Sequence, residues 1–184
     1  FEQLNVADIP NTRPDQPKNI VLYGFGRIGR LMARMLAQTT GPGNYFRLRG
    51  VVVRKNSDDD LIKRASLLRR DSVHGRFDGT IRVDLENDLL VINGNPVKFI
   101  YANSPADIQY SDFKIDSPIV IDNTGIWRDE ESLSQHLSSG ASKVILTAPA
   151  KGDIRNIVFG VNDSALQESD TIISAASCTT NAIV

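Results

Sequence analysis

The sequence has little of several features that mark particular classes of protein. It has one cysteine in 184 residues, so no disulfide can form within the chain, and a reducing compartment such as the cytoplasm is expected. No apolar run approaches the roughly 18 residues that a membrane-spanning helix needs, so no membrane partner is expected. The net charge of −1 gives no electrostatic reason to expect nucleic acid as a partner. A small basic cluster is interpreted as the solvated face of a helix, and it comprises Lys63, Arg64, Arg69 and Arg70.

Both ends of the chain suggest a piece of a longer protein. Residues 1–18 hold three prolines and no periodicity, which predicts an extension or linker, and they lack the apolar core of a signal peptide. Residues 19–184 are predicted to form one domain. The chain begins with Phe1 and ends at Val184 inside an apolar run, so further residues are expected at both ends.

Short apolar runs alternate with segments of helical periodicity. Strands are predicted at residues 20–23, 51–53, 89–92, 97–100, 119–121, 144–146, 157–159 and 171–173. Helices are predicted at residues 30–38, 61–68 and 129–139, with the first ended by residues 41–43, Gly-Pro-Gly. The pair Asn93-Gly94 predicts a hairpin turn. The alternation predicts an α/β fold with a doubly wound, mostly parallel sheet, as in Rossmann-type dinucleotide-binding domains.

A glycine-rich turn follows the first predicted strand and opens the first predicted helix. From Gly24 to Gly29 it is Gly-Phe-Gly-Arg-Ile-Gly. In such a turn the first glycine permits the tight bend, the second lets a pyrophosphate approach the backbone, and the third lets the helix pack closely. The phosphates then lie at the positive end of the helix dipole. The turn predicts binding of NAD or NADP, and a purely structural βα turn is the alternative.

The tip of the second predicted strand lacks the acid that usually binds the adenosine ribose. Arg54, Lys55 and Asn56 stand there, and residues 58–60, all aspartates, come later as capping residues of the next helix. Arg54 and Lys55 would suit the 2′-phosphate of NADP, so NADP is predicted to bind at least as tightly as NAD. Two solvated cations in a loop are the alternative.

The single cysteine, Cys178, lies among hydroxyl residues between an apolar strand and the predicted start of a helix. A cysteine at a helix amino terminus has its thiolate stabilised by the helix dipole, which makes it nucleophilic. A small buried side chain is the alternative. Neither His74 nor His136 is predicted to be the base that such a nucleophile needs, and no metal site is expected.

A series of segments from about Asn19 to Val184 occurs in the order and spacing of glyceraldehyde-3-phosphate dehydrogenases. The most specific is Ser-Cys-Thr-Thr-Asn at residues 177–181. The others are residues 24–30, 71–77, 92–96, 123–125, 147–149 and 159–162. The chain thus resembles the dinucleotide-binding half of this family, ending just past the catalytic cysteine.

The resemblance implies that glyceraldehyde 3-phosphate is oxidised with NAD or NADP and inorganic phosphate, through a thioester on Cys178. It also implies a glycolytic enzyme that is a homotetramer at full length. Most of its catalytic domain, with the base and the phosphate-binding arginine, would lie beyond Val184, so the chain alone is expected to be inactive. Erythrose-4-phosphate dehydrogenases would look much the same, and a non-catalytic dinucleotide-binding module is a further alternative.

The resemblance also assigns roles to single residues. The pyrophosphate would bind backbone N–H groups of Arg27 and Ile28, and the adenosine end would lie against Thr124 and Gly125, with Trp127 nearby. The remaining assignments are Gly24, Phe25, Gly26, Gly29, Arg54 and Asn56 around the cofactor, Thr147 and Ala148 beneath the nicotinamide, and Ser177 and Thr179 at phosphate.

Some residues depart from the usual pattern of the family. Tyr23 stands where asparagine is usual, Asn56 where the ribose-binding aspartate is usual, and Asn103 where an arginine commonly flanks the adenine. All of these positions lie on the cofactor. The resemblance therefore leaves the choice between NAD and NADP open.

Overall fold

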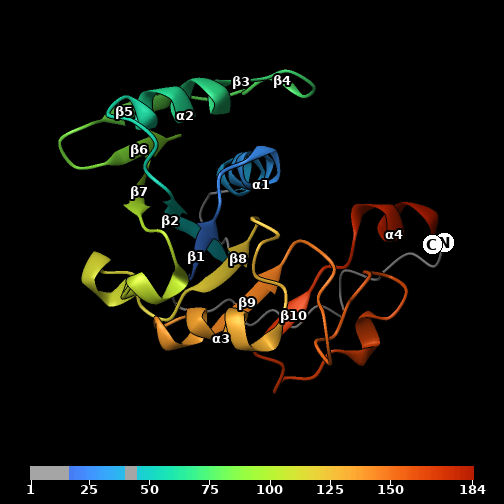
Figure 1. Ribbon diagram of the computed structural model, residues 1–184. Helices are drawn as coiled ribbons and strands as arrows, with labels where there is room; N and C mark the ends of the chain where they lie inside the picture. The colour runs from blue at the N-terminus through green and yellow to red at the C-terminus, as the bar shows by residue number, and fades with distance from the viewer. Residues whose placement is uncertain (1–16, 40–44) are drawn as a thin grey trace.

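The computed structural model describes residues 17–39 and 45–184, which form a twisted sheet with helices on both faces (Figure 1). The strands of the sheet are β1 (Lys18–Tyr23), β2 (Phe46–Val53), β5 (Ile81–Asp84), β6 (Leu89–Ile92), β7 (Asn95–Tyr101), β8 (Ile119–Asp122), β9 (Lys143–Leu146) and β10 (Ile172–Ser174). Their order is β10-β9-β8-β1-β2-β7-β6-β5. Neighbours from β10 to β7 are parallel, and β7, β6 and β5 pair antiparallel. The predicted doubly wound, mostly parallel α/β sheet is confirmed.

The helices connect these strands or follow them. They are α1 (Arg27–Gln38), α2 (Asp60–Arg69), α3 (Glu130–Ser138) and α4 (Cys178–Ile183), with 3₁₀ turns η2 (Pro105–Asp107), η3 (Tyr110–Phe113) and η4 (Asp163–Ala165). A separate two-stranded ribbon pairs β3 (Arg70–Asp71) with β4 (Gly75–Arg76). In the described ranges, no helix is long and apolar enough to cross a membrane.

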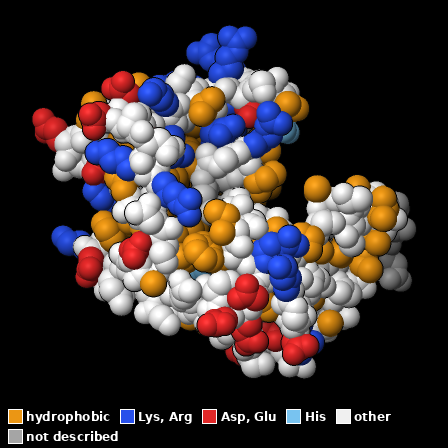
Figure 2. Space-filling model, viewed as in Figure 1, with side chains coloured by type: hydrophobic (Ala, Val, Ile, Leu, Met, Phe, Trp, Pro, Cys, Tyr) orange, Lys and Arg blue, Asp and Glu red, His pale blue; other side chains and the backbone are white. Residues whose placement is uncertain are grey.

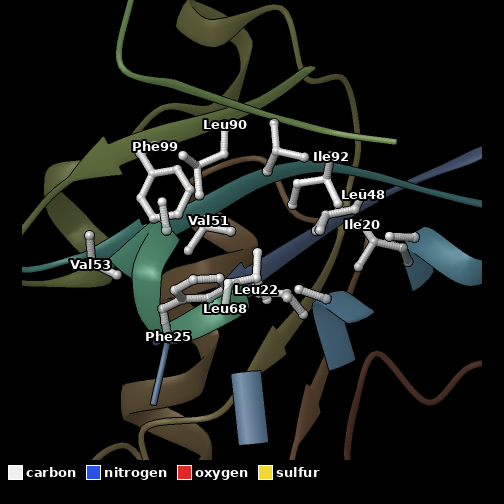
Figure 3. Packing of buried hydrophobic residues seen from close by; sticks show 14 of the residues in the cluster. Ile20, Leu22, Phe25, Leu48, Val51, Val53, Leu68, Leu90, Ile92 and Phe99 are labelled. Atoms are coloured by element: carbon white, nitrogen blue, oxygen red, sulfur yellow. The ribbon is translucent and has the colours of Figure 1, made fainter. Parts of the chain in front are cut away.

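Consecutive side chains of β1 enter two different cores. Ile20 and Leu22 pack with α1 and α2, whereas Val21 and Tyr23 pack on the other face with the η3 region. Because successive side chains of a strand point to opposite faces, a strand that is apolar at every position is buried on both sides. Figure 3 shows the first core, in which Leu22 and Phe25 lie near Phe99. This double burial fixes β1 at the centre of the sheet.

Most predicted elements are present with longer bounds. The helix predicted at 30–38 begins at Arg27 because the glycine turn leads directly into it. The hairpin at Asn93-Gly94 is confirmed, and both residues have positive φ values, +48° and +83°. The predicted helix stop at 41–43 and residues 1–16 of the predicted extension lie outside the described residues.

The prediction of a strand at residues 157–159 is wrong. Only Asn156 forms a bridge to the sheet, opposite Ser174 of β10. The backbone N–H of Val158 instead donates to Oδ1 of Asn162, at 2.7 Å, and the chain turns at Gly160 with a φ of +80°. Phe159 is 83% exposed. A local turn closed by a side chain therefore takes the hydrogen bonds that a strand would have used.

The order of the strands places a crevice at the carboxyl ends of β1 and β8. From β1 the chain adds β2 and then β7 on one side, and β8, β9 and β10 on the other side. In open parallel sheets, ligands bind where the strand order reverses in this way. The glycine turn follows β1, so it lies at this point of the fold.

Candidate functional site

The glycine turn between β1 and α1 has the backbone geometry that its sequence predicts. Gly24 has a φ of +95°, and a Cβ there would lie 2.9 Å from Cγ2 of Thr124. A Cβ at Gly29 would clash with the carbonyl oxygen of Gly24. A Cβ at Gly26 would meet nothing within 4 Å. The fold itself therefore requires the first and third glycines, whereas the second leaves open space beside the turn.

The amino terminus of α1 directs free N–H groups at that space. The first N–H groups of a helix have no acceptor within it. In α1, Gly26 provides no side-chain cap and the first turn holds no acid, whereas α3 is capped by the side chain of Asp129. The positive end of the α1 dipole is thus left for an anion, which suits a pyrophosphate. The N–H groups of Arg27 and Ile28 belong to this first turn.

A cavity of about 230 Å³ lies beside the turn, at the carboxyl ends of β1, β2 and β8. The predicted cofactor residues on its wall are Gly24, Phe25, Arg54, Asn56 and Thr124. Tyr23, Arg64 and Trp127 also line it. Because the strands are parallel, the fold brings residues from distant parts of the sequence to one edge of the sheet. The cavity and the open helix terminus together fit a dinucleotide.

A buried network supports Thr124 from behind. Oδ1 of Asp122 accepts hydrogen bonds from the backbone N–H and the hydroxyl of Thr124, each at 2.7 Å. Oδ2 of Asp122 lies 3.2 Å from Nε2 of His136, and both of these side chains are fully buried. The rings of Tyr23 and His136 meet edge to face, with centroids 4.7 Å apart. His136 is therefore tied into the core beneath the cavity, which agrees with the structural role predicted for it.

Tyr23 and Trp127 give the cavity an aromatic wall. Burial, followed by the negative charge of Asp122, raises the pKa of Tyr23 to about 12, so its phenol stays protonated at neutral pH. Aromatic side chains offer large apolar surfaces that suit a planar base. Tyr23 and Trp127 thus add apolar surface to the wall of the cavity.

The tip of β2 is basic, and it includes a residue that the sequence placed elsewhere. The side chain of Arg64 in α2 is only 15% exposed and lines the cavity, so its assignment to a solvated helix face is wrong. The carboxylate of Asp60 and the carbonyl oxygen of Arg54 both accept hydrogen bonds from its guanidinium. These two acceptors turn Arg64 inward, from α2 toward the end of β2. Nη2 of Arg54 lies 3.5 Å from the carbonyl oxygen of Asn103.

Two further predicted cofactor residues follow β9. The backbone N–H and the hydroxyl of Thr147 both donate to the carbonyl oxygen of Asp122, at 2.9 and 3.1 Å. A Cβ at Gly125 would lie 3.9 Å from that of Ala148. The loops after β8 and β9 therefore pack side by side. Thr147 and Ala148 lie outside the cavity wall, nearer to β10.

Cys178 is exposed and is the first residue of α4. Ser177 caps the helix, because its hydroxyl accepts a hydrogen bond from the N–H of Thr180 at 2.9 Å. The side-chain amide of Asn181 donates to two backbone carbonyl oxygens before the helix, at 2.9 and 2.8 Å. The predicted place of the cysteine at a helix amino terminus is confirmed. The phosphate contacts of Ser177 and Thr179 stay predictions.

The backbone before Cys178 is strained and firmly held. Ala176 is buried and has a φ of +59°, a conformation that side chains with a Cβ rarely adopt. The hydroxyl of Ser174, in β10, donates to the carbonyl oxygen of Ala148 at 2.7 Å and accepts from the N–H of Ala176 at 3.0 Å. These bonds fix the path from the sheet to α4.

Figure 2 shows a deep notch between the part of the surface over α1 and the part over α4.

The segment after α2 braces the start of α1. The carboxylate of Asp71 accepts hydrogen bonds from the N–H groups of His74 and Val73, each at 3.0 Å, and lies 3.7 Å from Arg27 and 3.5 Å from Arg30. The hydrogen bond from the N–H of His74, then that of Val73, holds the pKa of Asp71 well below its ordinary value. Nδ1 of His74 lies 3.1 Å from the same carboxylate. This position agrees with a structural role for His74.

Sequence reasoning missed Arg64 and Asp122, although the sequence holds a signal for each. Arg64 follows Asp60 by four residues, the spacing of an ion pair that turns both side chains to one helix face. Asp122 is a charged residue at the end of an otherwise apolar strand. A carboxylate at the carboxyl end of a parallel strand is a signal for a functional site.

A glycine turn at the point where the strand order reverses, followed by an open helix terminus, defines a dinucleotide-binding domain. Residues 18–130 match the sequence profile of the glyceraldehyde 3-phosphate dehydrogenase, NAD binding domain. The chain belongs to this family, and its cofactor is of the NAD type.

Curated relatives agree with this assignment. The chain is 55% identical to a glyceraldehyde-3-phosphate dehydrogenase-like protein of Pseudomonas aeruginosa (strain UCBPP-PA14), over 100% of the chain and 40% of the relative. It is 39% identical to glyceraldehyde-3-phosphate dehydrogenases of Thermotoga maritima and Zymomonas mobilis, over 89% of the chain and 46% of each relative. The chain therefore spans less than half the length of these relatives.

Proposed function

We propose that this chain is the cofactor-binding and nucleophile-bearing part of a dehydrogenase that oxidises glyceraldehyde 3-phosphate with inorganic phosphate. The observation that carries the proposal is a single sheet edge that presents both an open α1 terminus and the exposed Cys178. One group can hold a dinucleotide and the other can attack a carbonyl carbon. The names of the relatives support an oxidoreductase.

In the proposed reaction, the thiolate of Cys178 adds to the aldehyde carbon and forms a hemithioacetal. When bound, the dinucleotide supplies the acceptor for the hydride that leaves this carbon. Loss of this hydride, and of the hydroxyl proton to a base, would leave a thioester on Cys178. Phosphate then attacks the thioester carbonyl, the thiolate leaves, and an acyl phosphate is released.

In this proposal, residues at different places along the sheet edge would bind different parts of the cofactor and the substrate. The N–H groups of Arg27 and Ile28 would hold the pyrophosphate, and Thr124 would orient the adenosine end from its support on Asp122. The loop after β9 would lie beneath the nicotinamide. The hydroxyls of Ser177 and Thr179 would donate to phosphate.

The proposal also assigns tasks beyond this chain. A base that takes the proton of the hemithioacetal, and a cation for the substrate phosphate, would come from the part of the relatives' length that this chain does not span. The homotetramer and the glycolytic role implied by the resemblance are parts of the same proposal.

The test compares the complete gene product with its Cys178→Ser variant, and Ser66→Ala on the exposed face of α2 is the matched control. We expect reduced dinucleotide to form from glyceraldehyde 3-phosphate and phosphate in the wild type and the control. The Cys178→Ser variant should lose on the order of 10³-fold or more in rate but keep its dinucleotide affinity. Faster oxidation of erythrose 4-phosphate than of glyceraldehyde 3-phosphate would contradict the proposed substrate assignment. Dinucleotide binding without oxidation of either aldehyde would instead support a non-catalytic module.

A further inference from the structure

The wall of the cavity at the tip of β2 carries positive charge. Arg54, Asn56 and Arg64 line it there, and no residue on the cavity wall is an acid. Domains that bind NAD usually place a carboxylate at this strand tip, where it accepts hydrogen bonds from the ribose hydroxyls. This wall therefore lacks the group that selects NAD, and it presents two guanidinium groups instead.

Arg64 is held in place before any ligand binds. Its Nε donates to Oδ2 of Asp60, and its Nη2 donates to the carbonyl oxygen of Arg54 at 3.1 Å. A guanidinium group has five N–H donors, so these two bonds leave others for a ligand. Because the side chain is mostly buried and fixed at two points, little conformational entropy would be lost on binding an anion.

The charges near the wall favour an anion. Asp60 is buried and paired with Arg64, so this pair has no net charge. Asp58 is fully exposed and lies 4.0 Å from Lys55. Within the described ranges no acid pairs with Arg54, and its Nη2 lies 3.5 Å from the carbonyl oxygen of Asn103. The wall therefore has an excess positive charge, and Arg54 carries it.

Lys55 has a different place from the one that the sequence suggested. Its Nζ lies 5.6 Å from the centroid of the Tyr101 ring, and it does not line the cavity. Arg64, and not Lys55, stands beside Arg54 on the cavity wall. Asn56 completes the wall with an amide, which can donate as well as accept hydrogen bonds and does not repel an anion.

We propose that Arg54, Arg64 and Asn56 bind the 2′-phosphate of NADP, so that this domain binds NADP more tightly than NAD. The inference rests on the proposed function, because it places the adenosine end of the dinucleotide in the same cavity. A phosphate monoester carries a charge of about −1.5 to −2 near neutral pH, and guanidinium groups bind it through paired hydrogen bonds.

The experiment measures the affinity of the chain for NADP and NAD by calorimetry, with 2′,5′-ADP and 5′-ADP as shorter probes. We expect NADP to bind at least about tenfold more tightly than NAD, and 2′,5′-ADP at least about tenfold more tightly than 5′-ADP. This preference should shrink as salt is raised, because the added interaction is ionic.

Two variants test the residues. Arg54→Gln should weaken NADP about tenfold and change NAD by less than about threefold. Asn56→Asp should weaken NADP at least as much while it keeps or strengthens NAD, because it restores a carboxylate. The matched control is Lys63→Gln, a substitution on α2 away from the cavity wall, which should leave both affinities unchanged.

The outcomes separate this inference from the proposed function. Equal or tighter binding of NAD overturns the 2′-phosphate site and leaves the proposed function intact. Tighter binding of NADP that Arg54→Gln and Asn56→Asp do not alter also overturns the site. If neither dinucleotide binds the folded chain, both the site and the proposed function fail.

Discussion

The imidazole of His136 and the carboxylate of Asp122 form a fully buried pair, with Nε2 3.2 Å from Oδ2. The other oxygen of Asp122 accepts both hydrogen bonds from Thr124. One carboxylate therefore connects α3, through His136, to the loop that lines the cavity. Nδ1 of His136 has no hydrogen-bond partner among the described residues, so the ring depends on Asp122 for its polar contact.

Replacing Asp122 by alanine should both destabilise the fold and weaken dinucleotide binding. Removing the carboxylate leaves the buried ring of His136 and the N–H and hydroxyl of Thr124 without their hydrogen-bond partner, and each buried polar group left unsatisfied typically costs about 1–3 kcal/mol. It also frees Thr124. The free energy of unfolding in urea, with calorimetry for NADP, measures both effects. Asp78→Ala, at an exposed acid, is the control and should change stability by less than about 0.5 kcal/mol. An Asp122→Ala variant as stable as this control would contradict the prediction.

The two glycines Gly26 and Gly29 should respond differently to alanine. Gly29→Ala should destabilise the fold by about 1–3 kcal/mol, since its Cβ would clash with the carbonyl oxygen of Gly24. Gly26 has an extended backbone that alanine can adopt and open space around it, so Gly26→Ala should cost no more than about 1 kcal/mol. Its new methyl group would occupy the space proposed for the pyrophosphate. We therefore expect its dinucleotide affinity to fall about tenfold or more.

Thermal unfolding and calorimetry on the same two variants test this difference. The prediction fails if Gly26→Ala binds dinucleotide as the wild type does. It also fails if Gly29→Ala is as stable as the wild type.

Asp71 should give the protein a stabilising contribution that acid removes. Its pKa in the folded protein is lowered by N–H donors and by Arg27, whereas an unfolded aspartate titrates near a pKa of about 3.9. The contribution is therefore fully present above about pH 4 and is lost as the pH falls toward the lower folded pKa. Asp71→Asn should be less stable than the wild type at pH 7, and this gap should begin to narrow as the pH falls below about 4.

Urea unfolding from pH 7 to pH 3 checks this, with Asp78→Asn as the exposed control. Asp84, Asp129 and Asp170 also have lowered pKa values, so both proteins lose stability in acid, and the difference between them is the quantity to compare. A gap that stays constant down to pH 3 would show that Asp71 acts through packing and not through its charge.

The sequence predicts the frame of this fold well because the local signals agree with the global arrangement. The first strand is apolar at consecutive positions from Ile20 to Tyr23. Gly24 has a positive φ, and Gly29 has no room for a Cβ, so both positions require glycine. The strand predicted at 157–159 is absent because Oδ1 of Asn162 accepts the hydrogen bond of the Val158 N–H, which a strand would have used in the sheet. Hydrophobic periodicity does not reveal such a side-chain interaction.

The parts of the site that the sequence did not predict depend on contacts between distant residues. Arg64 faces the cavity because the carbonyl oxygen of Arg54, the residue after β2, accepts a hydrogen bond from its guanidinium. The pairing of Asp122 with His136 depends on how α3 lies against β8. Neither relationship follows from hydrophobic periodicity, so the composition of the cavity wall required the three-dimensional structure.

The chain by itself should bind dinucleotide and yet fail to oxidise glyceraldehyde 3-phosphate. The reaction needs a base near the nucleophile, and loss of a base typically costs about 10²–10⁴-fold in rate. Of the two histidines, His136 is buried against Asp122 and His74 lies against Asp71. Neither is therefore available as a partner of Cys178.

The thiol of Cys178 should nevertheless react, because it is exposed. We expect iodoacetamide to alkylate the folded chain, NADP to bind, and the absorbance of reduced dinucleotide to stay constant with aldehyde and phosphate present. The matched control is Cys178→Ser, which should bind NADP equally and resist alkylation. Since positioned reacting groups are needed to within a fraction of an ångström, a nucleophile without its base and substrate cation should not turn over. Turnover by the chain that Cys178→Ser abolishes would contradict this, because a base would then have to lie within these residues.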